Sequence, residues 1–310
     1  MTTASAPGKI ILFGEHAVVY GRPALAIPVT QVQATATVSE NSRGGVWIEA
    51  PNVSLSCGLS SLAADHPLAA TVHSVFSTLG IARPPACTVY IQSTIPVAAG
   101  LGSGAAVSVA VLRALSAFLG QPLPDEQVNR LAFETEKLHH GTPSGIDNTV
   151  VTYARPVYFV KSKPIRTFRV GAAFTIVIGD TGISAPTKES VAAVRKLWKA
   201  DPSRWEKIFD RVGELAWDAR QAIECGNPAE LGRLMNANQA LLQGLTVSSL
   251  ELDQLIETAR KSGALGAKLS GGGRGGNMIA LVPREKAPAL AEALLSAGAK
   301  RAIVSTIQPK

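Results

Sequence analysis

The spacing of apolar residues predicts strands and helices in the first half of the chain. Segments in which every second residue is apolar are typical of strands with one covered face. This pattern, together with a short apolar run near the start, predicts strands at 9–13, 31–39, 46–50 and 87–93. Apolar residues three or four positions apart predict helices at 67–79, 105–119 and 125–138.

The second half begins with strands and continues mostly as helices. The strand pattern recurs at 156–160, 166–170 and 173–179. Helices are predicted at 187–199, 203–225, 228–245, 249–263 and 286–297, a glycine-rich turn within 267–282 leads into a strand, and a last strand is predicted at 301–306. Because strands and helices come in runs without regular alternation, we predict an α+β fold. The length of 310 residues predicts two domains, at 1–160 and 161–310.

Composition and charge narrow the class of protein. The chain is 46% hydrophobic and carries a net charge of +7, so a large core and anionic ligands are expected. It has no block rich in Lys and Arg, which disfavours a nucleic-acid partner. Three cysteines without a CxxC motif fit a reducing cytosol. With no apolar signal core in the first nine residues and no run of about 18 apolar residues, we expect a cytoplasmic protein without a membrane partner.

The segment 96–107, P-V-A-A-G-L-G-S-G-A-A-V, joins a predicted strand to a predicted helix. Its alternating glycines at positions 100, 102 and 104 leave room for backbone N–H groups to converge on one point. The helix that follows adds unpaired N–H groups and the positive end of its dipole. Such a segment is a ready site for an anion, most often a phosphate. A tight turn without a ligand has the same pattern.

Two well-known phosphate-binding loops do not fit this segment. A Walker A loop requires Lys followed by Ser or Thr directly after its last glycine, and Ala105 and Ala106 stand there instead. A Rossmann loop requires a second strand ending in an acidic residue about 20 positions on, whereas here a second helix is predicted. We therefore expect a phosphate loop of a third kind.

Polar residues also gather in two other segments. Residues 14–21, G-E-H-A-V-V-Y-G, follow the predicted strand 9–13 abruptly, where functional sites often lie. Residues 139–148, H-H-G-T-P-S-G-I-D-N, contain glycine and proline, which predict an irregular loop. Both have a plain structural interpretation, in which Lys9 is a solvated strand start and Asp147 a turn former. The adjacent histidines lack further ligands at zinc spacing, so zinc is not expected.

Three glycine-bearing segments together resemble the three motifs of the GHMP kinases, which phosphorylate galactose, homoserine, mevalonate and phosphomevalonate. They read P-G-K-I-I-L-F-G-E-H-A-V-V-Y-G, P-V-A-A-G-L-G-S-G-A-A-V and K-L-S-G-G-G-R-G-G-N. The first motif and the loop G-T-P-S-G-I-D-N are most similar to those of the mevalonate kinases. The resemblance covers nearly the whole chain. It implies the two-domain α+β fold of that family, with the active site in the cleft between the domains.

The resemblance implies an enzyme that transfers the γ-phosphoryl group of ATP to the 5-hydroxyl of mevalonate, with Mg²⁺. In that scheme Asp147 is the catalytic carboxylate and Lys9 the cation beside it. The implied metal ligands are Glu136, eleven residues before Asp147, and Ser103. Glu134 is the neighbour most easily confused with Glu136, and an exposed helix glutamate is the plain alternative for both.

The resemblance also implies the binding residues. For ATP they are Pro96, Ala99, Gly100, Leu101, Gly102, Ser103, Gly104 and Ala105. For the mevalonate end they are Glu15, His16, Tyr20, Ser144 and Thr181, with Thr187 as a further candidate. The third glycine loop contributes Gly271, Gly272, Gly273 and Arg274. A homodimer is the family-level expectation.

Two positions depart from the family pattern. The family loop usually reads G-L-G-S-S, and the second serine, assigned to Mg²⁺, is Gly104 here. The hydroxyl ligand is then Ser103, water or absent. Arg274 stands where the third motif usually has glycine, and it reaches a phosphate, an acidic substrate or only solvent. Phosphomevalonate kinase activity, phosphorylation of the 3-hydroxyl and a non-catalytic ligand sensor are the alternative functions, and the complete acid–base set counts against the sensor.

Overall fold

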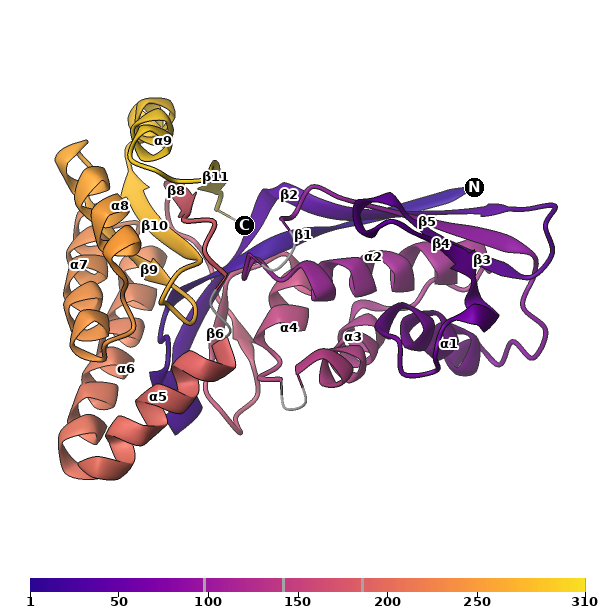
Figure 1. Cartoon of the computed structure of the whole chain (residues 1–310), viewed down its shortest axis with the longest axis horizontal. Coiled ribbons are helices and arrows are strands. Elements are labelled where there is room, and N and C mark those ends of the chain that lie inside the picture. The colour runs from indigo at the N-terminus through magenta and orange to yellow at the C-terminus, as the bar shows by residue number, and fades with distance from the viewer. Residues whose placement is uncertain (97–98, 141–142, 185–186, 310) are drawn as a thin grey trace. The chain divides into compact units, whose positions relative to one another are not determined.

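The computed structural model describes residues 1–96, 99–140, 143–184 and 187–309 (Figure 1). The chain forms two compact units. The first comprises Met1–Lys9, Val32–Val97 and Leu101–Ala154, and the second comprises Ile10–Gln31, Ala98–Gly100 and Arg155–Lys310. A segment close to the N-terminus therefore belongs with the second half of the chain. Independent folding of 1–160 and 161–310 as domains stays a prediction.

The strands of the first unit form a sheet in the order β4-β3-β5-β2, and β1 pairs with β2. They are β1 (Thr2–Phe13), β2 (Ala24–Glu40), β3 (Val46–Ala50), β4 (Leu55–Gly58) and β5 (Cys87–Ser93). One face is apolar, with Ala36 opposite Ile91 and Val38 opposite Val89. On the other face hydroxyls pair between strands, as between Thr3 and Thr37 at 3.0 Å. This alternation is what the sequence pattern predicts.

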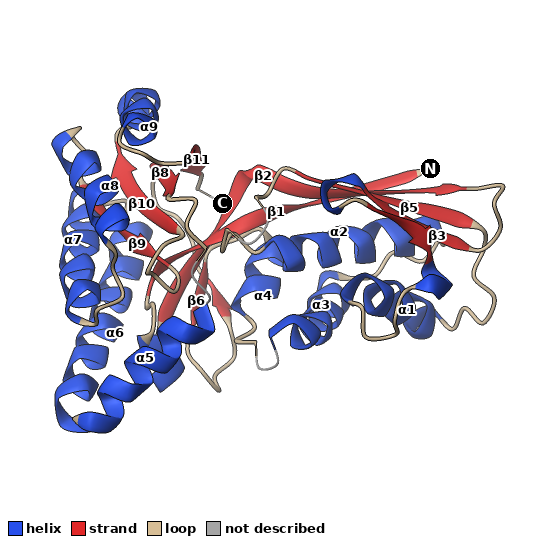
Figure 2. Cartoon of the chain, viewed as in Figure 1, coloured by secondary structure: helices blue, strands red, loops and turns tan. Residues whose placement is uncertain are grey.

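Helices cover the apolar face of that sheet (Figure 2). They are α1 (Pro67–Leu79), α2 (Ser103–Phe118), α3 (Asp125–His140) and α4 (Ile146–Tyr153). Helix α2 is the most central, since it contacts β5 and the other three helices, and its apolar residues are almost all buried. The phosphate-loop candidate therefore leads into the helix around which this unit packs.

The second unit holds a separate antiparallel sheet in the order β11-β8-β10-β9. Its strands are β8 (Phe174–Asp180), β9 (Gly266–Ser270), β10 (Asn277–Val282) and β11 (Arg301–Ile307). Two short strands, β6 (Val157–Phe159) and β7 (Arg166–Thr167), belong to the other sheet, where β6 pairs with the start of β2 and β7 with β6. The central strands β8 and β10 are buried along their whole length. Continuous apolar runs are typical of strands covered on both faces.

Helices pack on this second sheet and on one another. They are α5 (Thr187–Ala200), α6 (Pro202–Glu224), α7 (Pro228–Gly244), α8 (Leu250–Lys261) and α9 (Ala287–Ser296). Short 3₁₀ turns lie at Ala17–Tyr20, Pro51–Val53, Leu59–Ser61 and Arg284–Lys286. No helix within the described ranges is long and apolar enough to cross a membrane.

The sequence pattern predicted most elements correctly, but the prediction for 139–148 was wrong in one respect. Helix α3 extends to His140, and α4 begins at Ile146, so Asp147 lies in the first turn of a helix rather than in an irregular loop. Gly141 and Thr142 lie outside the described residues. Helix α4 reads I-D-N-T-V-V-T-Y, and its β-branched residues have low helix propensity. Val150 and Val151 are buried, and this packing stabilises the helix in a way that helix propensity does not include.

Candidate active site

Lys9 and Asp147 form an ion pair in the first unit. Lys9 lies in β1 and is 7% exposed. Asp147 lies in the first turn of α4, which begins after Gly145 in the left-handed conformation. The Lys9 Nζ and Asp147 Oδ2 atoms are 3.1 Å apart. The side chain of Asp147 is 28% exposed, so its carboxylate is both held by the lysine and accessible from solvent.

The second glycine of the phosphate-loop candidate lies directly against this pair. Gly102 has φ +73°, and a Cβ atom there would lie 2.8 Å from Lys9 Cγ and 3.6 Å from Asp147 Oδ2. The Lys9 N–H donates to the carbonyl of Leu101 at 2.9 Å. A side chain at Gly102 would therefore displace Lys9, and the left-handed φ favours glycine independently. Glycine is required here by contact and by conformation.

Glu136 is the third charged group of this cluster. It lies on α3 and is 5% exposed. Burial and the nearby negative charge of Asp147 raise the pKa of Glu136 from 4.5 to about 8, against the opposing effects of Lys9 and of a hydrogen bond from the Asn148 backbone. Glu134, in contrast, is 57% exposed and pairs with Lys137 at 2.7 Å. The structure thus brings Glu136, and not Glu134, to the Lys9–Asp147 pair.

The charges of this cluster are suited to a divalent cation. Asp147 pairs with Lys9, and burial together with the charge of Asp147 raises the pKa of the neighbouring Glu136. Carboxylate oxygens are ligands that Mg²⁺ accepts, with phosphate oxygens and water at the other positions. The described residues contain no group of three or more His, Cys, Asp or Glu side chains that could hold a metal alone. A metal here would thus depend on ligands from a nucleotide.

The start of α2 offers backbone donors rather than side chains. Helix α2 begins at Ser103, and the Ala106 N–H donates the first hydrogen bond of the helix to the Gly102 carbonyl at 3.0 Å. The N–H groups of the preceding turn have no acceptor within the helix. Leu101 and Ala105 are 1% exposed, so their side chains belong to the core. Ser103 is half-buried and Gly104 exposed. Pro96, also half-buried, directly precedes residues 97–98, which the structure does not describe.

In the second unit His16 connects the first motif to the third glycine loop. Its Nε2 lies 3.0 Å from the carbonyl oxygen of Gly272, so Nε2 carries the proton and donates. Nδ1 is buried and has no hydrogen-bond partner within the described part of the chain. Burial lowers the pKa of His16 to about 4, and the positive charge of Arg274 acts in the same direction. His16 is therefore neutral at pH 7, and its Nδ1 is an unused acceptor.

Glu15 lies beside His16 but is enclosed. Its carboxylate pairs with Lys268, and neither side chain has any exposed surface. The Asn238 Nδ2 group donates to Glu15 Oε2 at 3.3 Å, and Lys268 Nζ donates to the carbonyl of Leu269 at 2.6 Å. Burial lowers the pKa of Lys268 in spite of the paired carboxylate. The predicted contact between Glu15 and a substrate would require this pair to open.

The remaining residues predicted for the substrate lie in both units. Tyr20 is stacked on Phe209, with ring centroids 4.1 Å apart. The Thr181 hydroxyl donates to the carbonyl of Gly276 at 3.0 Å, so it is joined to the third glycine loop. Ser144 belongs to the first unit, is exposed, and accepts a hydrogen bond from the Ile146 N–H at 3.3 Å. Their contact with substrate stays a prediction.

The third glycine loop joins β9 to β10 and explains the unusual position of Arg274. Arg274 has φ +61°, in the left-handed region that glycine favours. A side chain at the preceding Gly273 would lie 2.0 Å from the Val247 carbonyl, to which the Arg274 N–H donates at 2.7 Å. A Cβ atom at Gly272 would lie 3.1 Å from Thr187 Oγ1. Arg274 itself is exposed, and contact with a phosphate or an acidic substrate stays a prediction.

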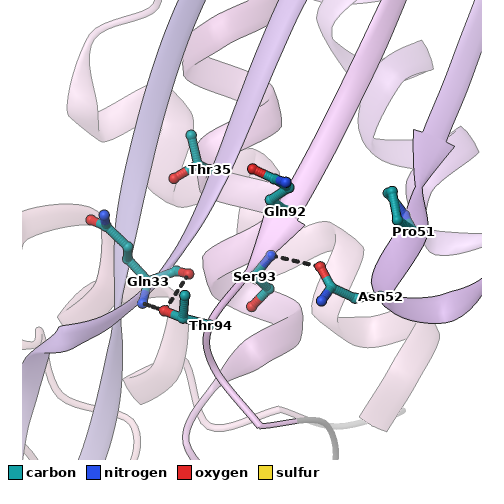
Figure 3. Close-up of a pocket in the computed structure, with 7 residues that line it drawn as sticks. All are labelled: Gln33, Thr35, Pro51, Asn52, Gln92, Ser93 and Thr94. Atoms are coloured by element: carbon teal, nitrogen blue, oxygen red, sulfur yellow. Dashed lines mark hydrogen bonds between the residues drawn. The ribbon is translucent and has the colours of Figure 1, made fainter.

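The first unit also has a polar recess that lacks the chemistry of a catalytic site (Figure 3). Its lining is composed of amides, hydroxyls and one proline, from Gln33, Thr35, Pro51, Asn52, Gln92, Ser93 and Thr94. Asn52 accepts a hydrogen bond from the Ser93 backbone at 2.9 Å. None of these side chains titrates near neutral pH. Acid–base chemistry therefore belongs to the Lys9–Asp147 cluster and not to this recess.

Sequence reasoning missed three residues of the second unit that hold its motifs together. Lys268 and Asn238 enclose Glu15, and Asn277 donates to the carbonyl of Ala99 in the phosphate loop. Lys268 lies in the middle of the buried strand β9, and Asn277 is the first residue of the buried strand β10. A polar residue in a fully apolar run is a signal of a buried partner, and this signal was available in the sequence.

Comparisons with known proteins place the chain in a family. The family model for the GHMP kinases N terminal domain matches residues 66–155, and that for GHMP kinases C terminal matches residues 219–300. A mevalonate kinase of Thermococcus gammatolerans is 40% identical over 95% of this chain and 93% of its own length. The chain belongs to the GHMP kinase family. A mevalonate kinase of Pyrococcus horikoshii is 39% identical to this GHMP kinase, over 93% and 91% of the two chains.

Solved structures agree with this assignment. The L. major mevalonate kinase in complex with R-mevalonate is 30% identical, with a TM-score of 0.87 over 100% of this chain and 97% of its own. The phosphomevalonate kinase of Streptococcus pneumoniae has a TM-score of 0.82 over 99% and 100% of the two chains, at 17% identity. At that identity the second likeness shows the fold alone. The resemblance read from the motifs and the predicted α+β fold are both confirmed.

The pKa of Glu136 predicts a pH-dependent gain in stability when its charge is removed. Between pH 4.5 and about 8 the folded kinase holds a proton that the unfolded chain releases, so wild-type stability falls as the pH rises. The Glu136→Gln variant lacks this loss and should be more stable than wild type at pH 9 by roughly 2–4 kcal/mol. Urea unfolding from pH 5 to 9 in EDTA measures it. The exposed Glu134→Gln is the control, and parallel curves for wild type and Glu136→Gln would contradict the assignment.

The enclosed Glu15–Lys268 pair predicts strongly non-additive effects on stability. Glu15→Leu or Lys268→Met alone leaves one buried polar group without its partner and should cost about 3–5 kcal/mol. The double variant removes both charges and should lose less than either single variant. Urea unfolding of all four proteins gives the coupling free energy. Additive losses would show that the two charges do not depend on each other.

Proposed function

We propose that this chain is a mevalonate kinase, which transfers the γ-phosphoryl group of ATP to the 5-hydroxyl of (R)-mevalonate. The observation that carries the proposal is the Lys9–Asp147 ion pair against Gly102, with the buried Glu136 beside it. The curated relatives that bear this name align over almost the whole chain. Fold alone would not support an activity, so the argument rests on these side chains.

Asp147 accepts or orients the proton of the attacking hydroxyl. An alcohol is a weak nucleophile toward phosphorus, and a carboxylate within hydrogen-bond reach assists it as the proton leaves. Lys9, with its Nζ atom 3.1 Å from Asp147 Oδ2, holds this carboxylate in place by its charge. The same ammonium group stabilises negative charge on the attacking oxygen. The roles of both residues depend on their being held together before the substrate arrives.

The glycine loop binds the triphosphate through its backbone. Gly100 and Gly102 both have φ above +70°, and α2 directs its unpaired N–H groups toward the loop. Glu136 and Ser103 are the proposed Mg²⁺ ligands. The second serine of the family loop, which usually supplies a hydroxyl ligand, is replaced by Gly104 here. When bound, Mg²⁺ would neutralise charge on the phosphate oxygens.

The mevalonate end of the site is proposed to involve His16 of the first motif. His16 is neutral and its Nδ1 is a buried acceptor without a donor, so it is suited to a substrate hydroxyl. Ser144, Tyr20 and Thr181 are further candidates. Glu15 supports His16 from behind through its pair with Lys268.

Location and assembly follow as secondary proposals. Cys57, Cys87 and Cys225 are free thiols, which accords with the reducing cytoplasm. A homodimer remains the family-level prediction, and sedimentation equilibrium measures it directly.

Release of ADP from Mg²⁺-ATP with a panel of alcohols tests the function. The panel contains mevalonate, 5-phosphomevalonate, homoserine and galactose, and phosphorus NMR identifies the oxygen that is phosphorylated. Turnover of mevalonate alone, with phosphate on the 5-oxygen, is the expected result. Turnover of 5-phosphomevalonate alone would keep the chemistry and replace the substrate. If no alcohol of the panel causes release of ADP, the proposal is contradicted and a non-catalytic ligand sensor is favoured.

Replacement of the catalytic carboxylate separates binding from chemistry. Asp147→Asn keeps the size of the side chain but removes its charge and its capacity to accept the proton. Turnover should fall by about 10²-fold or more, while the affinity for ADP changes little. The matched control is Asp125→Asn, an aspartate in the first turn of α3 that pairs with Arg113 at 2.6 Å. Full activity of Asp147→Asn would remove it from the mechanism.

A further inference from the structure

Asn277 is a polar residue in a place where an apolar one would be expected. It is the first residue of β10, which reads N-M-I-A-L-V and is buried throughout. Asn277 is 3% exposed. The five residues that follow it are apolar, and the sheet neighbours on both sides of β10 are buried as well. The amide group therefore needs a specific reason to be there.

The only hydrogen bond of this amide found among the described residues goes to the phosphate loop. The Asn277 Nδ2 group donates to the carbonyl oxygen of Ala99, and both residues belong to the second unit. The Oδ1 atom is buried and has no donor within the described ranges. A half-satisfied buried amide destabilises a core relative to an apolar side chain of the same size. The retained interaction is thus the one with Ala99.

That hydrogen bond fixes the direction of one N–H group of the loop. The peptide unit is planar and trans, so its C=O and N–H point to opposite sides. With the Ala99 carbonyl directed at Asn277, the Gly100 N–H is directed away from it. Gly100 has φ +72° and is exposed, and glycine resists rotation of its peptide less than other residues. If this peptide flipped, an oxygen would replace the N–H group that faces an anion.

The strand that carries Asn277 is itself firmly held. Asn277 lies opposite Ser270 on β9 and opposite Asp180 on β8. The Ser270 hydroxyl donates to the carbonyl of Ile11 at 2.6 Å, and Asp180 accepts from the Gly182 N–H at 2.8 Å. The row of polar residues at this end of the sheet thus holds three separate loop and strand segments. Asn277 can position Ala99 because its own backbone is fixed on both sides.

We propose that Asn277 is a positioning residue for the nucleotide: its amide holds the Ala99–Gly100 peptide so that the Gly100 N–H faces the phosphates. The inference rests on the proposed function only in that the ligand of the loop is a nucleotide. It does not depend on which alcohol is phosphorylated. Asn277 does not touch the reacting atoms in this scheme and acts through the loop alone.

Two variants of Asn277 test the inference. Asn277→Leu keeps the approximate size of the side chain and Asn277→Ala truncates it, and both leave the Ala99 carbonyl without its donor. Because a hydrogen bond to a charged phosphate is lost when the N–H turns away, ADP affinity should fall by about 10- to 100-fold. Calorimetry measures this affinity. In steady-state assays KM for ATP should rise by a similar factor, while KM for the alcohol changes less than about twofold.

Asn236 provides a matched control. It lies on α7 in the same unit, and its Nδ2 group also donates to a backbone carbonyl, that of Leu265. Its Oδ1 accepts from Arg260 and from the Ala267 N–H, so Asn236→Ala should destabilise this unit at least as much as Asn277→Ala. ADP affinity should nevertheless stay within about twofold of wild type. A loss as large as that of Asn277→Ala would reduce the effect to general destabilisation and overturn the inference.

The possible outcomes separate this inference from the proposed function. If Asn277→Leu binds ADP as wild type does while mevalonate is still phosphorylated, Asn277 has no positioning role and the function stands. If ADP affinity falls as expected but another alcohol is the acceptor, the inference stands and the substrate changes. If the wild-type chain binds no nucleotide, both are wrong. A crystal structure of Asn277→Leu with the Ala99 carbonyl still in its original direction would also contradict the inference.

Discussion

The burial of Lys9 in β1 is the constraint on which the candidate site depends. An ammonium group removed from water is strongly destabilising unless a carboxylate accompanies it. Asp147 meets this requirement at 3.1 Å, and the requirement fixes where α4 must begin. The loop that carries Gly102 must then pass over the lysine without a side chain. One buried charge thereby constrains a position within β1, the start of a helix and a glycine loop.

The two buried lysines of this chain illustrate how exposure separates structure from chemistry. Lys268 and Glu15 have no exposed surface, and backbone and amide groups satisfy their remaining hydrogen bonds. That pair is complete without a ligand. In the Lys9–Asp147 pair the carboxylate is 28% exposed, and burial and the charge of Asp147 raise the pKa of the neighbouring Glu136. Only the second arrangement leaves a carboxylate free to meet an incoming hydroxyl.

The spacing of apolar residues was sufficient to predict those helices and strands in which that spacing is regular. The bounds of α1 and β5 agree with the predicted ranges because their apolar spacing is regular. Helix α4 was missed because its β-branched residues favour a helix only once they are packed. The motifs identified Lys9 and Asp147 as candidates, but their contact depends on the tertiary structure and cannot be read from the sequence. Arg274 was recognised as unusual from the sequence, and its φ of +61° gives the physical reason why glycine is common there.

Several of the buried polar atoms left without partners in the described residues lie on the motifs, and others, such as Thr152, Ser190 and Ser305, do not. His16 Nδ1 belongs to the first motif, Asn277 Oδ1 to the third, and Asn148 Oδ1 directly follows the catalytic candidate. Unsatisfied buried atoms are uncommon in native proteins because each one lowers stability. A chain selected only for stability would replace them with apolar side chains, such as those at 278–282 in β10. For the atoms that lie on the motifs, a bound ligand is a reason to keep a polar residue that the fold alone does not supply.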